Sequence, residues 1–100
     1  MRATLSRQAL RDLTEAAHWI AQDNPGAARA FRKSIDDATA RIGSQANIGV
    51  SRPHLAGEPY RFLVLSGFPY ILVYNAARRP PRVVRILHGA RDLPALLDDL

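Results

Sequence analysis

The residues best suited to chemistry lie near the end of the chain, where His88 and Arg91 stand in a short basic turn. A histidine is able to act as a general acid, and an arginine can stabilise the charge that develops on a phosphodiester. Histidines at the ends of strands are often structural, so the same turn is also consistent with a binding surface. Phosphodiester cleavage and binding without catalysis therefore both remain open at this point.

The sequence shows no other arrangement of residues that is typical of a reactive site. His18, His54 and His88 share no ligand spacing such as i, i+4, so no metal site is predicted. The glycines beyond residue 43 stand alone and none opens a long helix, which argues against a phosphate-binding loop. No pattern joins a serine to a histidine and an acid. We expect no cofactor and no metal.

Arginine dominates the charge of the chain, because Lys33 is the only lysine beside thirteen arginines and the net charge is +5. Guanidinium groups pair bidentately with carboxylates and phosphates, so a surface rich in them suits an acidic protein or a nucleic acid. A GC-rich genome also favours arginine codons, but it explains the local absence of acids less well. Between Glu58 and Asp92 there are six arginines and no acid, namely Arg61, Arg78, Arg79, Arg82, Arg85 and Arg91.

One hundred residues with 47% hydrophobic content are enough for one globular domain, residues 1–100. Cysteine is absent, which excludes disulfides and thiolate metal sites and fits a reducing compartment. The N-terminal residues have no apolar signal-peptide core, and the longest apolar run, Tyr70 to Tyr74, is far shorter than the ~20 residues of a membrane span. We therefore expect a cytoplasmic protein without membrane contact.

The first residues predict an edge strand over Arg2 to Leu5 and then a helix. Ser6 is a suitable N-cap, and small and aliphatic residues at spacings of three and four give the helix one apolar stripe as far as about Gln22. Trp19 lies about 100° from the centre of that stripe. Its ring therefore either covers the edge of the core or serves a partner.

Asn24 and Pro25 predict the start of a second helix, because asparagine caps helices and proline fits the first helical position. The apolar stripe of this helix ends at Ile42, and Gly43 is expected to stop it. Since the link between the two helices is short, they should form an antiparallel hairpin with a shared apolar face.

The second half predicts a loop over Ser44 to Pro59 and then three strands, Tyr60 to Leu65, Tyr70 to Asn75 and Arg82 to His88. Short links between them indicate an antiparallel meander. The middle strand is almost entirely apolar, as expected of a central strand that is covered on both faces. In the last strand we expect side chains to alternate strictly between the two faces.

The chain should end in a short helix that is capped by Asp92 and limited by Pro94 to about two turns. A helix of this length is not stable alone, so its apolar residues, Leu93, Leu96 and Leu97, need an apolar surface. It is either an ordinary helix that closes the core or a flap that contacts a partner. We expect it to supply part of the cover of the sheet face that the helical hairpin leaves open, with a partner supplying the rest. In the complex with a partner it should dock on the edge of the chain's own sheet, and in the free chain it should be the most mobile element.

Two segments, Pro69-Tyr-Ile-Leu-Val-Tyr74 and Arg85-Ile-Leu-His-Gly-Ala-Arg-Asp-Leu93, together with the order of elements, resemble the ParE branch of the RelE/ParE toxin superfamily over nearly the whole chain. The resemblance implies an α+β fold of RelE/ParE type with the order β-α-α-β-β-β-α. In it, an N-terminal strand and a two-helix antiparallel hairpin pack on an antiparallel β-sheet meander, followed by a short C-terminal helix. It also implies a toxin of a bacterial type II toxin-antitoxin module for plasmid stabilisation. Such a toxin is neutralised by a ParD-like antitoxin, reaches operator DNA only through that antitoxin, and targets DNA gyrase.

Related toxins of this superfamily cleave mRNA on the ribosome with a glutamate, a central arginine and a histidine-tyrosine pair. Matched by motif, those places fall near Arg52, at Ile71 and at His88-Gly89, so only the histidine is kept. Loss of a single contributor to transition-state stabilisation costs ~10²-fold or more. The resemblance therefore implies a toxin that acts by binding, with no catalytic residue, and ribosome-dependent mRNA cleavage is the alternative.

Partner and target contacts are expected on the basic sheet, on the flank of the first helix and on the terminal segment. An acidic, amphipathic antitoxin segment would cover the apolar surface that the isolated chain exposes around the first helix and on the outer sheet face. The candidate binding residues are Trp19, Arg61, Arg78, Arg79, Arg82, Arg85, His88, Arg91, Leu93, Leu96 and Leu97.

Overall fold

The computed structural model describes residues 1–100 and confirms the predicted α+β fold. A four-stranded sheet has the order β1-β4-β3-β2. Strands β2, β3 and β4 form the predicted antiparallel meander, while β1 adds to β4 in parallel, so the sheet is mixed. The elements are β1 (Thr4–Leu5), α1 (Arg7–Asp23), α2 (Pro25–Ser44), β2 (Tyr60–Val64), β3 (Tyr70–Asn75), β4 (Arg82–His88) and α3 (Leu93–Leu96).

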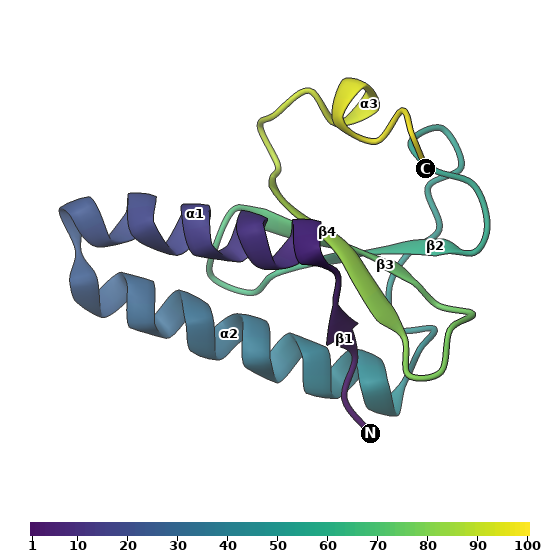
Figure 1. Ribbon diagram of the computed structural model, residues 1–100, viewed down its shortest axis with the longest axis horizontal. Helices are drawn as coiled ribbons and strands as arrows, with labels where there is room; N and C mark the ends of the chain where they lie inside the picture. Colours follow the sequence, from purple (N-terminus) through teal and green to yellow (C-terminus); the bar gives the residue numbers. More distant parts are fainter.

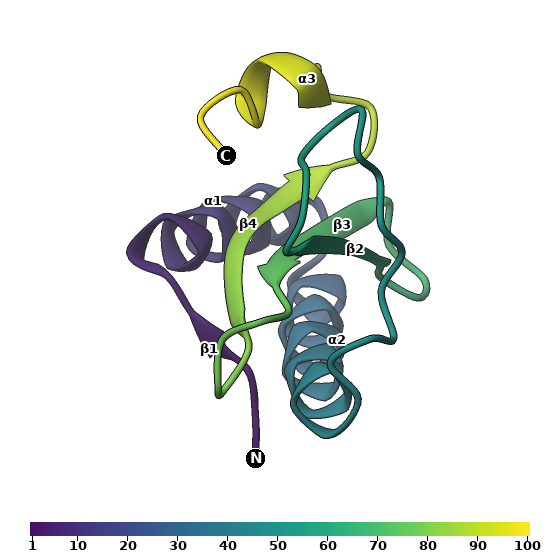
Figure 2. The same cartoon turned by 90° about the vertical axis from the view of Figure 1, so that its right-hand side faces the viewer.

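The two long helices form an antiparallel hairpin on one side of the sheet, and α3 lies on the other side (Figures 1 and 2). Their predicted N-caps are confirmed. Ser6 Oγ accepts a hydrogen bond from the Ala9 amide at 3.0 Å, and Asn24 Oδ1 accepts one from the Ala27 amide at 3.1 Å. Each cap satisfies an amide that the helix leaves without an internal partner.

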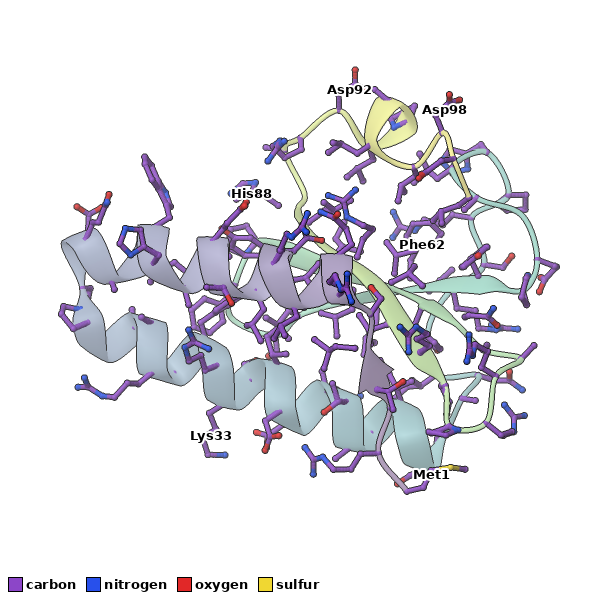
Figure 3. The ribbon with its side chains drawn as sticks, in the orientation of Figure 1. Met1, Lys33, Phe62, His88, Asp92 and Asp98 are labelled. Atoms are coloured by element: carbon purple, nitrogen blue, oxygen red, sulfur yellow. The ribbon has the colours of Figure 1, made fainter.

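The predicted stop of α2 at Gly43 is wrong, because the helix continues to Ser44 and its C-cap is Gln45. Gly43 has a different role in the structure. A Cβ atom at this position would lie 1.8 Å from the carbonyl oxygen of Met1 and 2.7 Å from the Cα atom of Arg2. The N-terminal segment therefore crosses the end of α2 at a distance that only glycine allows, and Figure 3 shows Met1 beside that end.

The larger apolar core lies between the helical hairpin and the sheet. Five residues of this core are completely buried, with 0% of their surface exposed: Phe31 and Ile42 of α2, and Leu72, Tyr74 and Val83 of the sheet. The spacing of the apolar residues along α1 and α2 therefore predicts correctly which stripes face the sheet.

A second, smaller core covers the opposite face of the sheet. Leu97, which is only 1% exposed, packs there with Phe62, Ile71 and Val73, and Leu93 and Leu96 lie against its edge. The long loop contributes Ala56 and Leu55 to the same cluster. The terminal segment therefore covers part of this face, as predicted, and in the free chain it packs on the face of the sheet and not on its edge. The predicted length of two turns is wrong, because α3 has one turn.

The prediction of strict alternation in β4 is also wrong. Tyr74 pairs with Val83 and Val73 pairs with Arg85, which leaves Val84 as an extra residue in a β-bulge. Val83 and Ile86 consequently both face the larger core, while Val84 lies against the smaller one. A bulge bends its strand and redirects the side chains that follow.

The loop between α2 and β2 is fixed to the sheet by a buried tyrosine. The Tyr74 hydroxyl donates to the Ala46 carbonyl at 2.6 Å and accepts from the Gly49 amide at 2.8 Å. Burial raises the pKa of Tyr74 above its ordinary value of 10.0, and the Gly49 amide and Arg61 lower it in part. The hydroxyl therefore stays protonated and can donate at neutral pH.

Candidate functional site between α1 and β4

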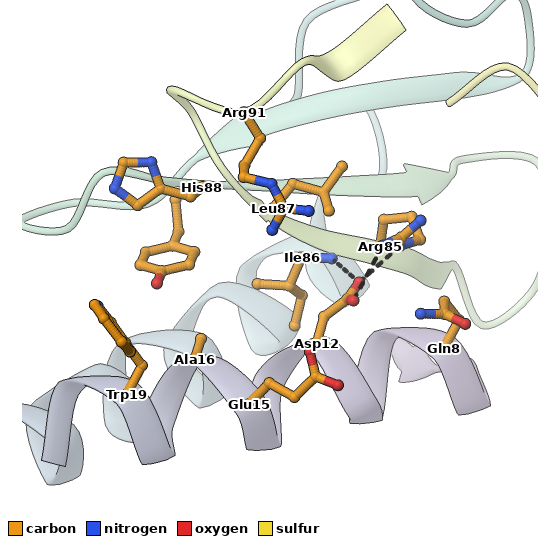
Figure 4. Close-up of a pocket in the computed structure, with 11 residues that line it drawn as sticks. Gln8, Asp12, Glu15, Ala16, Trp19, Arg85, Ile86, Leu87, His88 and Arg91 are labelled. Atoms are coloured by element: carbon orange, nitrogen blue, oxygen red, sulfur yellow. Dashed lines mark hydrogen bonds and ion pairs between the residues drawn. The ribbon is translucent and has the colours of Figure 1, made fainter. Parts of the chain in front are cut away.

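A cavity of about 500 Å³ lies between α1 and the second half of β4, and we call it the α1–β4 groove (Figure 4). Its helical wall carries residues spaced along one side of α1, and its other wall carries the end of β4 and the following turn. The groove is lined by Gln8, Asp12, Glu15, Ala16, Trp19, Tyr70, Arg85, Ile86, Leu87, His88 and Arg91.

One end of the groove is aromatic. The side chain of Trp19 is 68% exposed, whereas tryptophan side chains in folded proteins are on average mostly buried. The ring of His88 meets the ring of Tyr70 edge to face, with 5.1 Å between the centroids, and His88 Nδ1 accepts from the Ala90 amide at 3.0 Å. The aromatic surface at this end therefore comes from Trp19 and the partly exposed ring of His88, which rests on the buried ring of Tyr70. The Nε2 atom of His88 takes no part in the bond to Ala90.

Arg91 brings a positive charge to this aromatic end. Burial raises the pKa of the Tyr70 hydroxyl above its ordinary value of 10.0, and the charge of Arg91 lowers it in part. Arg91 itself takes part in none of the three ion pairs of the protein, which join Arg2 to Asp36, Lys33 to Asp37 and Arg85 to Asp12. Its guanidinium is available to a carboxylate or phosphate of a ligand.

The middle of the groove is closed by a buried ion pair. The two carboxylate oxygens of Asp12 accept from Arg85 Nε at 2.8 Å and from Arg85 Nη2 at 3.2 Å. One of them also accepts from the Ile86 amide at 2.9 Å. The hydrogen bond to Asp12 raises the pKa of Arg85 above its ordinary value, although burial opposes that effect. Arg85 therefore remains charged at any physiological pH.

Asp12 of this ion pair also helps to satisfy the backbone hydrogen-bonding groups at the free edge of β4. Strand β1 pairs only with Arg82 and Val83, so the rest of β4 has no neighbouring strand on that side. The Ser6 hydroxyl donates to the Val84 carbonyl at 3.1 Å, and Asp12 accepts from the Ile86 amide. Side chains of α1 and its cap thus satisfy backbone groups that would otherwise be buried without a partner.

Asp12 is an important residue of the groove that is absent from the binding residues expected from the sequence. It lies three residues after Ala9 and four before Ala16, which are both buried on the stripe of α1 that faces the sheet. An acidic residue on an apolar stripe is unusual unless it is paired. The position of Asp12 on the apolar stripe was therefore the only signal in the sequence that it is paired. Its partner, 73 residues away, cannot be identified from local spacing.

The structure divides the sequence-predicted binding residues into separate groups. Trp19, Arg85, His88 and Arg91 meet in the groove, but Arg85 is engaged by Asp12 and also approaches the Leu96 carbonyl at 3.4 Å. Arg61 donates from the edge of the sheet to the Gly49 carbonyl at 2.8 Å. Elsewhere lie Arg78, Arg79 and Arg82 at the turn between β3 and β4, and Leu93, Leu96 and Leu97 on the smaller core.

The groove does not combine the groups that the mRNA-cleaving relatives use. The place of their central arginine is taken by Ile71, which is buried in the smaller core. His88 lies in the groove without an arginine from β3 beside it. No group of three or more histidine, aspartate or glutamate side chains is placed to hold a metal ion. The geometry is that of an open groove with one aromatic end and one cation, Arg91, that forms no ion pair.

None of the helices combines the length and the apolar character that crossing a membrane requires.

Comparisons with known proteins agree with this geometry. One match among solved structures is described as "Chromosomal ParDE TA system from P. aeruginosa", with a TM-score of 0.70 and 22% sequence identity. The match covers 88% of this chain and 95% of that chain, and it shows the fold. No curated protein matches the sequence significantly. The family model described as "ParE toxin of type II toxin-antitoxin system, parDE" matches residues 3–93, and the chain therefore belongs to the ParE toxin family.

Proposed function

We propose that this toxin acts by binding DNA gyrase, without catalysis, and that a ParD-like antitoxin neutralises it. The observation that carries the proposal is the family match over residues 3–93, which spans all of the groove-lining residues. The antitoxin is supported by the similar fold of a protein from a ParDE system. The absence of catalysis is supported by the groove, in which His88 has no arginine of β3 beside it.

The α1–β4 groove is the surface on which we place the antitoxin. It offers an exposed tryptophan, an aromatic end and the free guanidinium of Arg91, on a chain of net charge +5. An acidic, amphipathic segment suits this combination, because its apolar side chains can cover Trp19 while a carboxylate pairs with Arg91. Aromatic residues and arginine are the types that contribute most to the affinity of interfaces.

One induction experiment tests the proposed target. The chain is expressed without antitoxin, and gyrase cleavage complexes and the DNA-damage response are measured beside mRNA cleavage and translation. We expect cleavage complexes to accumulate before any change in mRNA. If mRNA is cleaved early on the ribosome and no gyrase cleavage complexes form, the gyrase proposal is wrong and the endonuclease alternative is favoured. His88 and Arg91, which line one groove, would then be the candidate residues for cleavage.

Replacement of His88 by alanine should reduce toxicity by less than about tenfold, because loss of a catalytic histidine would cost ~10²-fold or more. The measurement is the induction level that halves growth. Thermal unfolding and antitoxin binding check that the loss of the contact with Tyr70 leaves the fold intact. His54→Ala, in an exposed loop, is the matched control. A well-folded His88→Ala protein that has lost toxicity while His54→Ala keeps it would overturn the non-enzymatic proposal.

Replacement of Trp19 by alanine should weaken antitoxin binding by about 30-fold or more, which corresponds to a hot spot of about 2 kcal/mol. Because Trp19 is 68% exposed, the change should leave stability almost unaltered. Calorimetric titration measures the affinity. Leu10→Ala is the control, since Leu10 is 55% exposed on the same helix but outside the groove. Equal affinities of the two variants would place the antitoxin elsewhere.

A further inference from the structure

Three arginines form a basic tip that the groove does not include. Arg78 and Arg79 are exposed in the turn between β3 and β4, and Arg82 begins β4. Since β4 has seven residues at about 3.3 Å each, this tip lies roughly 20 Å from His88 at the other end of the strand. None of the three arginines takes part in an ion pair. We call Arg78, Arg79 and Arg82 the hairpin arginines.

The backbone of the tip is held in place by its own side chains. Arg79 Nη1 donates to the Ala76 carbonyl at 2.7 Å and to the Arg78 carbonyl at 2.8 Å. Asn75 Oδ1 accepts from the Ala77 amide at 2.9 Å. One nitrogen of Arg79 is thus used to orient the guanidinium, and its other nitrogens remain free for a ligand. A group that is already oriented loses less conformational entropy when it binds.

The base of the turn is equally restrained. The Thr4 amide donates to the Pro81 carbonyl at 2.9 Å, which ties the turn to β1. Pro80 and Pro81 further restrict the chain, because their rings fix one backbone dihedral angle each. The three arginines therefore extend from a turn whose backbone is restrained at its base and by the side chains of Asn75 and Arg79.

The composition of the tip favours a phosphate backbone over a protein partner. The turn and the first residue of β4 contain three cations, no acid and no large exposed apolar side chain of their own. Protein interfaces depend on buried aromatic or aliphatic anchors, which the tip lacks. Phosphate contacts need only charge and hydrogen-bond donors.

We propose that the hairpin arginines bind the phosphodiester backbone of duplex DNA. The major groove of B-form DNA admits a two-stranded β-ribbon, whereas the deep major groove of duplex RNA is too narrow for protein side chains to read. The proposal extends the proposed function, under which the toxin meets DNA held by gyrase. Operator DNA, which the family resemblance assigns to the antitoxin, is the other source of the same chemistry.

Salt dependence of DNA binding tests this contact. The full chain is titrated with a mixed-sequence duplex of 20 base pairs at 50 to 200 mM salt, with fluorescence anisotropy as the readout. Each phosphate contact contributes about 0.9 to the slope of log affinity against log salt. The double variant Arg78→Gln/Arg79→Gln should therefore have a slope that is shallower by about 1.8, and a lower affinity at every salt concentration.

The matched control removes the same charge from another surface. Arg29 and Arg32 are exposed on α2 and form no ion pair. The variant Arg29→Gln/Arg32→Gln should keep the wild-type slope. Equal slopes for the two double variants would mean that net charge alone attracts DNA, and the proposal would be overturned. Absence of duplex binding by the wild type, or equal binding of a duplex RNA of the same length, would overturn it as well.

Two further arms identify the source of the DNA and separate this proposal from the proposed function. In the first, the toxin-antitoxin complex is titrated with an operator duplex, and a loss of affinity in the hairpin variant identifies operator DNA. In the second, gyrase cleavage complexes are counted, and a loss with the hairpin variant identifies gyrase-held DNA. The wild-type toxin could fail to raise the level of gyrase cleavage complexes while the hairpin variant still shows the shallower salt slope with the short duplex. In that case the proposed function is wrong and the DNA contact is supported.

Discussion

Replacement of Asp12 by alanine is expected to lower the free energy of unfolding by about 3 kcal/mol, as found when one partner of a buried ion pair is removed. The substitution leaves the guanidinium of Arg85, whose side chain is 19% exposed, without its carboxylate. It also leaves the Ile86 amide without an acceptor. Both losses occur where little water can replace the missing group. Urea unfolding followed by circular dichroism gives the difference.

Two control variants show whether the effect comes from the ion pair. Glu15→Ala removes an exposed acid from the same helix, and it should change stability by less than about 0.5 kcal/mol. The double variant Asp12→Ala/Arg85→Met removes both charges, so it should recover a large part of the loss. An Asp12→Ala protein within about 1 kcal/mol of the wild type would show that the pair behaves like a surface contact.

Replacement of Leu97 by alanine should lower the free energy of unfolding by about 2–3 kcal/mol, toward the lower end of the range for buried leucines. Leu97 is 1% exposed and fills the smaller core against Ile71, Val73 and Leu87. Because this cluster lies under a short terminal helix, the segment can collapse partly into the space that is left. The same urea titration measures the effect, and hydrogen exchange along β3 shows whether the sheet face is opened.

Leu100→Ala is the matched control for this prediction. It removes the same atoms from the same segment, but Leu100 is 38% exposed, so the expected cost is below about 1 kcal/mol. If both variants lower the free energy of unfolding by the same small amount, the packing of the terminal segment does not stabilise the folded state. Its leucines would then be free to contact a partner.

The candidate site could be predicted only in part. Trp19 is recognisable because its helical position lies off the apolar stripe, and His88 and Arg91 because they follow a strand in a basic turn. Their meeting in one groove was not predictable, since it depends on how α1 lies along β4. The six arginines of the basic half look equivalent in the sequence. The structure separates Arg85, which is neutralised by Asp12, from the hairpin arginines, which are not.

The sequence by itself determined the order of the secondary-structure elements and the N-caps of the two long helices. Helical periodicity, alternation in strands and the cap residues Ser6 and Asn24 are local properties, because they depend on neighbours within a few positions. The charge bias of the second half was also plain from the sequence. These features were enough to indicate the order of elements and the stripes that face the core.

Only the tertiary structure decided which surfaces meet and which polar groups pair. The bulge at Val84, the passage of Met1 over Gly43 and the docking of Leu97 on a sheet face all depend on distant segments. Periodicity shows which side of an element is apolar, but not which element will cover it. The pairing of Asp12 with Arg85, 73 residues apart, likewise follows from the packing of α1 along the free edge of β4, because only there does a carboxylate find both a guanidinium and an unpaired backbone amide.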